Sequence, residues 1–307
     1  MSQITILMAC YNGMPYLPAA VESVQQQTFR DWTLLLINDG STDGSTDYLN
    51  QLTDSRIRVV HQHNQGLAAS LNNGIKLCET EFLARLDADD VAMPTRLEKQ
   101  LAFLQANPRV GLVGTQIAPL GEKRVGSGGS LPLDHRSIES GLLNGLHRVS
   151  HTSIMCRTAL MREIGGYWPK GVSEDWDMYL RMSERAELAN LSEVLVHYRV
   201  VESGIQSRGM AEVHSRIAYA CESARRRRAG REPITYEDFV KLRQQAPLWK
   251  RTVDAMHNYA QVQYRRALPE ILGRHPTRGY ARLALAAACS PLLTWNRVLR
   301  MVRSAGS

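Results

Sequence analysis

Short runs of apolar residues recur through the first 90 residues of the chain, and polar stretches separate them. The runs begin near Ile4, Trp32, Ile57 and Glu81, and they read ITILMAC, WTLLLIN, IRVVHQ and EFLARLD. The first two show little alternation between apolar and polar positions. Strands that helices cover on both faces have this pattern. We therefore predict four β-strands, the first two of them buried on both faces.

Helical spacing fills the intervals between these runs. Apolar residues recur three and four positions apart in 14–28, 46–52 and 67–78, and Pro94 is expected in the first turn of a fourth helix. Strand and helix thus alternate along the chain. This order predicts an α/β fold, with a doubly wound, mostly parallel sheet that has helices on both faces.

The later part of the chain divides into two regions. Within the first of them, the pattern predicts a further helix over 175–185 and a further strand over 193–201. Past Gly209 the composition shifts towards Arg and Ala with helical periodicity. We therefore expect an α/β domain over 1–209 and a helical C-terminal extension over 210–307.

Charge is distributed unevenly between these two regions. The chain has 307 residues, 44% of them hydrophobic, and a net charge of +7. Residues 1–209 hold 19 Lys/Arg and 23 Asp/Glu, a net of −4, whereas residues 210–307 hold 18 and 7, a net of +11. The composition excludes a mainly disordered chain. The basic extension favours a polyanionic partner such as nucleic acid or an anionic membrane surface.

Cysteine usage and hydropathy bear on the compartment. The five cysteines are scattered without a Cys-x-x-Cys pair, which is typical of free thiols in a reducing environment. The N-terminus lacks the pattern of a signal peptide. The longest apolar stretch near the C-terminus, 283–295, has 13 residues, and a membrane span needs about 20. We expect a cytoplasmic protein, either free or peripheral at the inner face of the membrane.

Polar residues follow each predicted strand. Carboxylates, amides and glycines occupy 9–13, 38–45, 63–66 and 87–90, which the parallel order brings to one edge of the sheet. Neither G-x-G-x-x-G nor a P-loop is present, so a carboxylate-held divalent cation is the alternative way to bind a diphosphate. Asp87 and Asp89 suit that role, although a solvated loop that caps the next helix would also carry such residues.

The segments ITILMACYNG, INDGSTDGSTD, NQGLAASLNNGI, RLDADD and SEDWDMYLRM resemble the family 2 glycosyltransferases of the GT-A fold. The resemblance covers roughly residues 3–207, in the family's order and spacing. It implies an inverting transferase that takes a sugar from a nucleotide-diphosphate donor, most simply a UDP-sugar. A divalent metal, Mg²⁺ or Mn²⁺, is implied as the cofactor. Residues 1–209 would then form the nucleotide-sugar-binding and catalytic domain.

The resemblance implies roles for residues on the donor side. Ala9 and Tyr11 would line the nucleoside pocket, with Tyr11 packing on the base. Asp39 would accept a hydrogen bond from a pyrimidine N–H, and Arg85 would reach the nucleotide or its phosphates. Asp87 would lie near the ribose and the donor sugar.

The same resemblance divides the remaining acids between metal and catalysis. Asp89, with Asp87, would ligate the metal that bridges the two phosphates. Asp175 matches the general base, with Glu174 beside it. Single displacement needs one base and a neutralised leaving group, and the residues supply both. A charge pair at a helix N-terminus is the alternative interpretation of Glu174 and Asp175.

On the acceptor side, His151 and Trp176 are candidate acceptor contacts. A structural histidine and a core tryptophan are the alternatives. One departure from the family stands out, because relatives often carry Tyr-Arg-x-His where this chain has Val201 in place of the histidine. The resemblance therefore assigns no third metal ligand, and Arg199 or Arg208 is a candidate to cover the diphosphate instead.

The arginines of the extension have three interpretations. Leucines and a tryptophan flanked by arginines in 278–303 suit a helix lying on an anionic membrane, where a lipid-linked acceptor would be found. An ordinary helical cap, on the catalytic domain or in a homo-oligomer, is the second. Specific nucleic-acid binding is disfavoured because no reader motif accompanies the arginines.

Two other functions remain open at this point. A metal-dependent nucleotidyltransferase would also use a parallel sheet and an acid-held metal. A non-catalytic membrane- or polyanion-binding protein on the same scaffold is the third candidate, and the full set of acids argues against it. We expect a transferase that extends a cell-surface polysaccharide on a glycan or lipid-linked acceptor.

Overall fold

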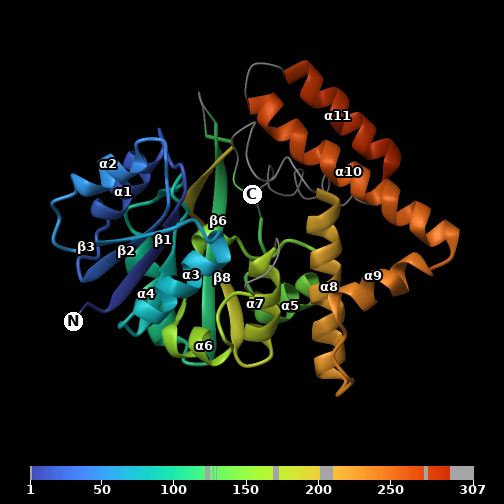
Figure 1. Ribbon diagram of the computed structural model, residues 1–307, viewed down its shortest axis with the longest axis horizontal. Helices are drawn as coiled ribbons and strands as arrows, with labels where there is room; N and C mark the ends of the chain where they lie inside the picture. Colours follow the sequence, from blue (N-terminus) through green and yellow to red (C-terminus); the bar gives the residue numbers. More distant parts are fainter. Residues whose placement is uncertain are drawn as a thin grey trace. The chain divides into compact units, whose positions relative to one another are not determined.

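The protein divides into two compact units (Figure 1). The first comprises residues 1–118 and 131–199, and the second comprises 119–130 and 200–307. The computed structural model describes residues 2–121, 125–126, 128, 130–168, 173–200, 210–272 and 276–290. The domain boundary expected near Gly209, together with Val201 and Arg208, lies outside these residues.

One eight-stranded sheet organises the first unit. Its strands are β1 (Ile4–Cys10), β2 (Trp32–Asp39), β3 (Ile57–Gln62), β4 (Phe82–Arg85), β5 (Val91–Ala92), β6 (Val110–Leu120), β7 (Met155–Arg157) and β8 (Glu187–Arg199). The spatial order is β3-β2-β1-β4-β7-β6-β8-β5, and the first four run parallel. All four predicted strands are present, and the α/β prediction is confirmed.

Helices connect these strands. They are α1 (Leu17–Gln25), α2 (Ser45–Asn50), α3 (Leu67–Leu77), α4 (Arg96–Ala106), α5 (His135–Leu143), α6 (Thr158–Glu163) and α7 (Glu174–Ser183), with a 3-10 turn η1 at His151–Ser153. One detail of the prediction is wrong. Pro94 precedes α4 rather than opening it, because the helix begins at Arg96 after the N-cap Thr95.

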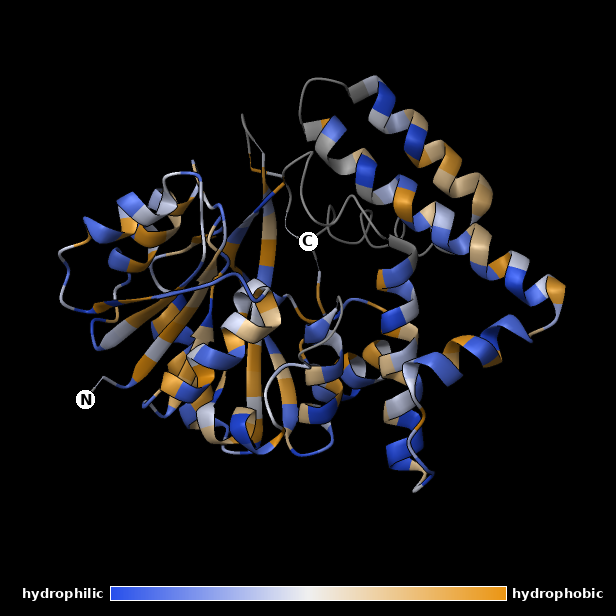
Figure 2. Cartoon of the chain, viewed as in Figure 1, coloured by the Kyte–Doolittle hydropathy of each residue, from blue (hydrophilic) through white to orange (hydrophobic). Residues whose placement is uncertain are grey.

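The two faces of β1 pack against different helices. Ile6 and Met8 join the core formed with α1 and α4. On the other face, Leu7 meets α3 so closely that a Cβ on Gly74 would lie 2.2 Å from Leu7 Cδ1. Figure 2 shows hydrophobic residues concentrated on these strands. Burial on both faces explains why the strand sequences lack alternation.

The part of the sheet beyond β4 differs from the expected parallel order. β7 is antiparallel to both β4 and β6, and β5 is antiparallel to β8. β8 begins at Glu187, six residues earlier than the pattern indicated. Short strands such as β5 and β7 carry too few residues for a periodicity to be recognised.

The second unit is helical. Its helices are α8 (Met210–Arg228), α9 (Tyr236–Gln244), α10 (Leu248–Leu272) and α11 (Pro276–Cys289). Arg282 of α11 pairs with Glu270 and donates to Gln263 on α10, whereas Ser290 meets His257, so the two helices run antiparallel. Across the described ranges, no helix combines the length and hydropathy of a membrane span.

The cysteines are free thiols, as expected. Cys10, Cys78, Cys156 and Cys221 are buried, and Cys289 is half-buried. Burial raises the pKa of the Cys10 thiol, so this thiol is protonated at neutral pH. The cysteines therefore pack as small apolar residues.

Candidate active site

Arg85 lies at the centre of the predicted site. It ends β4, and its side chain is only 2% exposed. Its Nη2 forms an ion pair with Asp87 Oδ1 at 2.5 Å. Its Nε and Nη1 are buried, and within the described residues they have no hydrogen-bond partner. A buried cation with unsatisfied donors is costly, so an anionic ligand would be favoured here.

The acids that follow β4 crowd one another. Burial and the charge of Asp87 raise the pKa of Asp89 to about 6. Burial, Asp87 and Asp89 hold the pKa of Asp90 well above its usual range. Arg199 donates its backbone N–H to Asp90 Oδ1 at 2.7 Å and its Nε to the Asp89 carbonyl at 3.0 Å. Arg199, a candidate to cover the diphosphate, therefore contacts the acidic loop that follows β4.

Asp87 and Asp89 could supply two of the ligands that a divalent cation needs. Repulsion between Asp87 and Asp89 would be relieved by a cation, and Mg²⁺ commonly takes one or two carboxylates and completes its shell with water and phosphate oxygens. Among the residues that the structure describes, His, Cys, Asp and Glu form no cluster of three that could hold a metal alone. A metal here would depend on the donor's phosphates.

A second acid pair opens α7. Glu174 and Asp175 lie in its first turn, after Ser173 with a left-handed φ of 68°. Burial and the neighbouring Glu174 raise the pKa of Asp175 to about 7. Burial raises the pKa of Glu174, and the charge of Asp87 adds to that effect. The fold thus brings the acids after β4 and the acids of α7 into one electrostatic cluster around Arg85.

Asp39 is buried at the end of β2 and already has partners. Its carboxylate accepts hydrogen bonds from Gln62 Nε2 at 2.6 Å and from the backbone N–H groups of Gln65 and Gly66 at 2.9 and 2.8 Å. It therefore anchors the turn that begins α3. A carboxylate has about four acceptor positions, so one remains for a ligand N–H.

Ala9 and Tyr11 lie at the end of β1, one strand away from Asp39. Ala9 is half-buried opposite Ile37 of β2, and Tyr11 is 55% exposed. An exposed aromatic ring is available to stack on a base.

The loops after β1 and β2 are tied together by hydrogen bonds between their own polar residues. Ser41 Oγ accepts from the Asn12 N–H, and Asn12 Oδ1 accepts from the Thr42 N–H. Asp43 Oδ2 accepts from the Met14 N–H at 2.9 Å. Polar residues were predicted after both strands, but their pairing across the two loops is visible only in three dimensions.

The two acceptor candidates differ. Trp176 is only 5% exposed, and its indole N–H donates to the Leu142 carbonyl between α5 and α7. These contacts support the alternative interpretation, in which Trp176 is a core residue. His151 is half-buried, and its Nε2 lies 2.8 Å from the Tyr167 hydroxyl. Burial and Arg85 hold the pKa of His151 well below its usual range.

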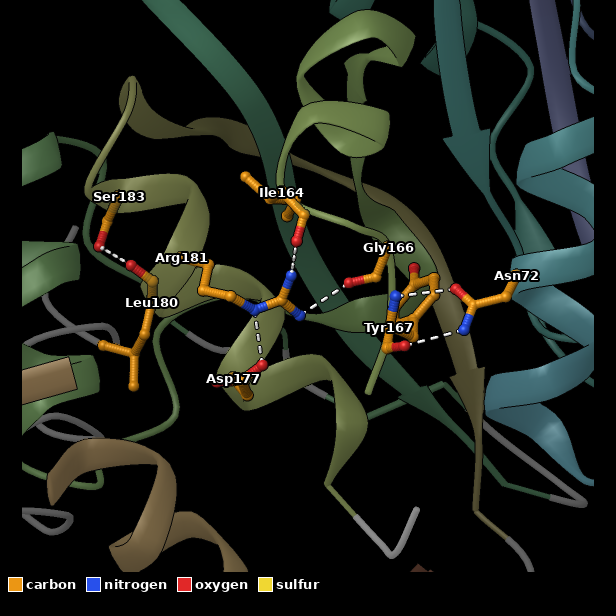
Figure 3. A network of polar contacts seen from close by, with 8 residues as sticks. All are labelled: Asn72, Ile164, Gly166, Tyr167, Asp177, Leu180, Arg181 and Ser183. Carbon is orange, nitrogen blue, oxygen red and sulfur yellow. Dashed lines mark hydrogen bonds and ion pairs between the residues drawn. The ribbon is translucent and has the colours of Figure 1, made fainter. Parts of the chain in front are cut away.

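A polar network connects Tyr167 to both α3 and α7 (Figure 3). Asn72 Oδ1 accepts from the Tyr167 N–H, and Asn72 Nδ2 donates to the Tyr167 carbonyl, both at 2.8 Å. Arg181 pairs with Asp177 at 2.6 Å and donates to the carbonyls of Ile164 and Gly166. The contact between Asn72 and Tyr167 carries no signal in the sequence, because no local pattern pairs positions 95 residues apart.

Residues 5–165 match the protein family described as glycosyl transferase family 2. An uncharacterized glycosyltransferase of Haemophilus influenzae is 31% identical over 213 residues, which are 64% of this chain and 65% of that protein. The O-antigen biosynthesis glycosyltransferase WbnJ of Escherichia coli is 28% identical over 217 residues, which are 69% and 85% of the two chains. The chain thus spans slightly less than two thirds of the first of these relatives.

Solved structures share the fold. TarS 1–349 of S. aureus in complex with UDP-GlcNAc superposes with a TM-score of 0.59 at 13% identity, over 92% of this chain and 89% of that one. The mannosyltransferase PcManGT from Pyrobaculum calidifontis in complex with GDP-Man and Mn²⁺ gives 0.56 at 16% identity, over 100% and 81%. The fold of this chain is therefore of the GT-A type.

Proposed function

The chain belongs to glycosyl transferase family 2, and on that premise we propose that it is an inverting enzyme of cell-surface polysaccharide biosynthesis. It moves a sugar from a nucleoside-diphosphate donor to a hydroxyl of a glycan or lipid-linked acceptor. The observation that carries the proposal is the cluster of Asp87, Asp89, Glu174 and Asp175 around the buried Arg85. Asp87, Asp89 and Arg85 are placed to bind a diphosphate through a metal, and Glu174 and Asp175 are placed to supply the general base.

Asp175 is the proposed general base. It accepts the proton of the acceptor hydroxyl, whose oxygen bonds to the anomeric carbon while the bond from that carbon to the phosphate oxygen breaks. Its raised pKa supports this role, because a base works best when its pKa is near the operating pH. Glu174 sustains that raised pKa through its neighbouring charge.

The leaving diphosphate needs positive charge. Asp89 and Asp87 are the proposed ligands of Mg²⁺ or Mn²⁺, which would neutralise charge on the phosphates. Arg85 contributes a buried guanidinium with two unsatisfied donors, and Arg199 lies against the Asp89 carbonyl. These two guanidinium groups cannot ligate a metal, and they are proposed to pair with the diphosphate instead.

The nucleoside is proposed to bind beside β1 and β2. Tyr11 offers an exposed ring for the base, and Ala9 is small enough to let the nucleoside approach the strand end. Asp39 keeps one acceptor position for a pyrimidine N–H, which favours a UDP-sugar.

A panel of UDP-, GDP- and dTDP-sugars with Mg²⁺ or Mn²⁺ tests this function. Release of nucleoside diphosphate with one of these donors is the expected result. Exchange of labelled pyrophosphate into the nucleotide sugar, without release of diphosphate, would instead assign nucleotidyl transfer.

The rate of transfer is expected to depend on pH near neutrality. The base must be ionised, so kcat should fall tenfold per unit below the pKa of Asp175, about 7, and level off above it. Glu174→Gln removes a neighbouring negative charge and should move this midpoint to lower pH. A midpoint near 4 in the unmodified enzyme, or no shift in the variant, would contradict the assignment of the base.

We also propose that α10 helps the enzyme dock on an anionic membrane. Five large apolar side chains on its first three turns are between 45% and 75% exposed: Leu248, Trp249, Val253, Met256 and Tyr259. Residues 210–272 and 276–290 carry 14 Lys/Arg against 7 Asp/Glu, so the helices attract negative charge. Residues 291–303 of the arginine-flanked stretch 278–303 lie outside the described residues.

Pelleting with vesicles that contain 30% phosphatidylglycerol, at about 50 mM salt, tests the docking proposal. We expect Trp249→Ser/Val253→Ser to lower the bound fraction several-fold, whereas Leu133→Ser, which removes an exposed leucine before α5, leaves it unchanged. Equal pelleting of the double variant would remove α10 from the docking surface. Sedimentation as a dimer that the double variant abolishes would assign this face to a second copy.

A further inference from the structure

The ring of His151 is fixed by one aromatic neighbour. Its Nε2 lies 2.8 Å from the Tyr167 hydroxyl, and the two rings meet edge to face with centroids 5.2 Å apart. Either group can be the donor in such a pair, so the position of the proton has to be inferred from the surroundings.

The surroundings assign the proton to the tyrosine. Tyr167 is 2% exposed, and burial holds the pKa of its phenol well above the usual range, so the hydroxyl keeps its proton. Among the described residues, His151 is the partner that the structure gives this hydroxyl. The phenol must therefore donate to Nε2, because a buried O–H without an acceptor is costly. A neutral histidine that accepts at Nε2 carries its own proton at Nδ1.

The backbone of Tyr167 is held firmly enough to set this geometry. Asn72 binds its N–H and its carbonyl together, and a Cβ on Gly166 would lie 2.4 Å from Asn72 Oδ1, so the contact needs glycine at 166 (Figure 3). Arg181 lies on α7, the helix that carries Asp175, and its Nη2 donates to the Gly166 carbonyl oxygen at 2.7 Å. The phenol is thus tied to α3 and to the helix of the proposed base.

The Nδ1–H of His151 is left for a ligand. No acceptor for it is found among the described residues, and His151 as a whole is not fully buried. Glu174 and Asp175 act electrostatically on Tyr167, so the pair lies on the side of the base. A sugar hydroxyl oxygen has free lone pairs and can accept this N–H.

We propose that His151 binds the acceptor through a hydrogen bond from Nδ1–H to a sugar hydroxyl oxygen, and that Tyr167, held by Asn72, is the positioning residue that fixes this tautomer. The proposal rests on the glycosyltransferase function proposed above. It adds a contact with the acceptor, and it explains why His151 is the donor in that hydrogen bond.

Transfer and hydrolysis together test the role of Tyr167. Nucleotide-sugar turnover is measured with water alone and with the p-nitrophenyl hexoside that the unmodified enzyme uses best. Tyr167→Phe is expected to raise the KM for this hexoside about fivefold, the loss of roughly one hydrogen bond, while hydrolysis stays within twofold. An unchanged KM would overturn the proposal, and so would equal losses in both reactions, which indicate a merely structural role.

A pair of histidine variants tests which nitrogen matters. The amide of Asn reaches the position of Nδ1, and that of Gln reaches the position of Nε2. His151→Asn should keep the KM for the hexoside within about threefold, whereas His151→Gln should raise it as Tyr167→Phe does. The opposite order would overturn the assignment. Tyr48→Phe, which removes a phenol from α2, is the matched control and should change neither reaction.

The tautomer can be observed without any substrate. Long-range ¹H–¹⁵N spectra of the ¹⁵N-histidine-labelled protein, with His151 assigned by its loss in His151→Asn, should show a protonated Nδ1. The same ring should shift towards protonated Nε2 in Tyr167→Phe. Protonated Nε2 in the unmodified protein would overturn the proposal. Because this readout needs no turnover, it separates failure of this inference from failure of the proposed function.

Discussion

Replacing Asp175 with asparagine is expected to lower kcat about 10³-fold, because removal of a general base typically costs 10²- to 10⁴-fold. Asparagine keeps the size and polarity of the side chain but cannot accept the proton of the acceptor hydroxyl. Donor affinity, measured by calorimetry with the nucleoside diphosphate, should stay within about twofold. Turnover of the nucleotide sugar is the measurement.

The stability of this variant distinguishes lost chemistry from lost structure. Burial and Glu174 raise the pKa of Asp175 in the folded protein to about 7, whereas an aspartate in the unfolded chain has a value near 3.9. Ionised Asp175 therefore lowers the stability of the fold as pH rises from about 4 through 7. Asp175→Asn should be at least as stable as the unmodified protein at pH 8. Asp31→Asn, an exposed acid before β2, is the control, and full activity of Asp175→Asn would contradict the base assignment.

Replacing Asp89 with asparagine is the second change with a large expected effect. It removes one of the two proposed metal ligands, and with it the repulsion between the carboxylates of Asp87 and Asp89. We expect kcat/KM to fall about 100-fold or more, because charge neutralisation on the leaving group contributes several kcal/mol. Calorimetry with UDP, with and without Mn²⁺, measures the binding part of the loss.

The metal-free titration is the informative control for Asp89→Asn. Affinity for UDP without Mn²⁺ should hardly change, whereas the gain that Mn²⁺ gives the unmodified protein should disappear. Asp47→Asn, an exposed acid on α2, should retain that gain. A full Mn²⁺ effect in Asp89→Asn would show that the metal is held elsewhere or that binding does not use one.

The N-terminal half of the sheet was predictable because its signal is local. The runs from Ile4 and Trp32 are long, apolar and followed by turn residues, and the structure has strands at both. The strands β5 and β7 have two and three residues, and their antiparallel partners lie more than 40 residues away in the chain. No periodicity in one short segment carries that information.

The candidate site was predictable to the level of residue type but not of contact. Family spacing pointed to Asp89 and Asp175, and the structure brings their surroundings into one cluster around Arg85. The family spacing could not reveal that the Trp176 side chain packs in the core, since an aromatic residue after an acid pair is compatible with either face of a helix. Nor could it reveal that Asn72 binds Tyr167, because that pairing is made by the fold alone.

The anomeric configuration of the transferred sugar tests the central claim most directly. The donor identified by nucleoside-diphosphate release is incubated with the enzyme and a hexoside acceptor, and ¹H NMR follows the anomeric proton from the first minutes. A single displacement assisted by Asp175 predicts a β-linked product from an α-linked nucleotide sugar, with none formed by Asp175→Asn. An α-linked product as the first one formed would contradict the account.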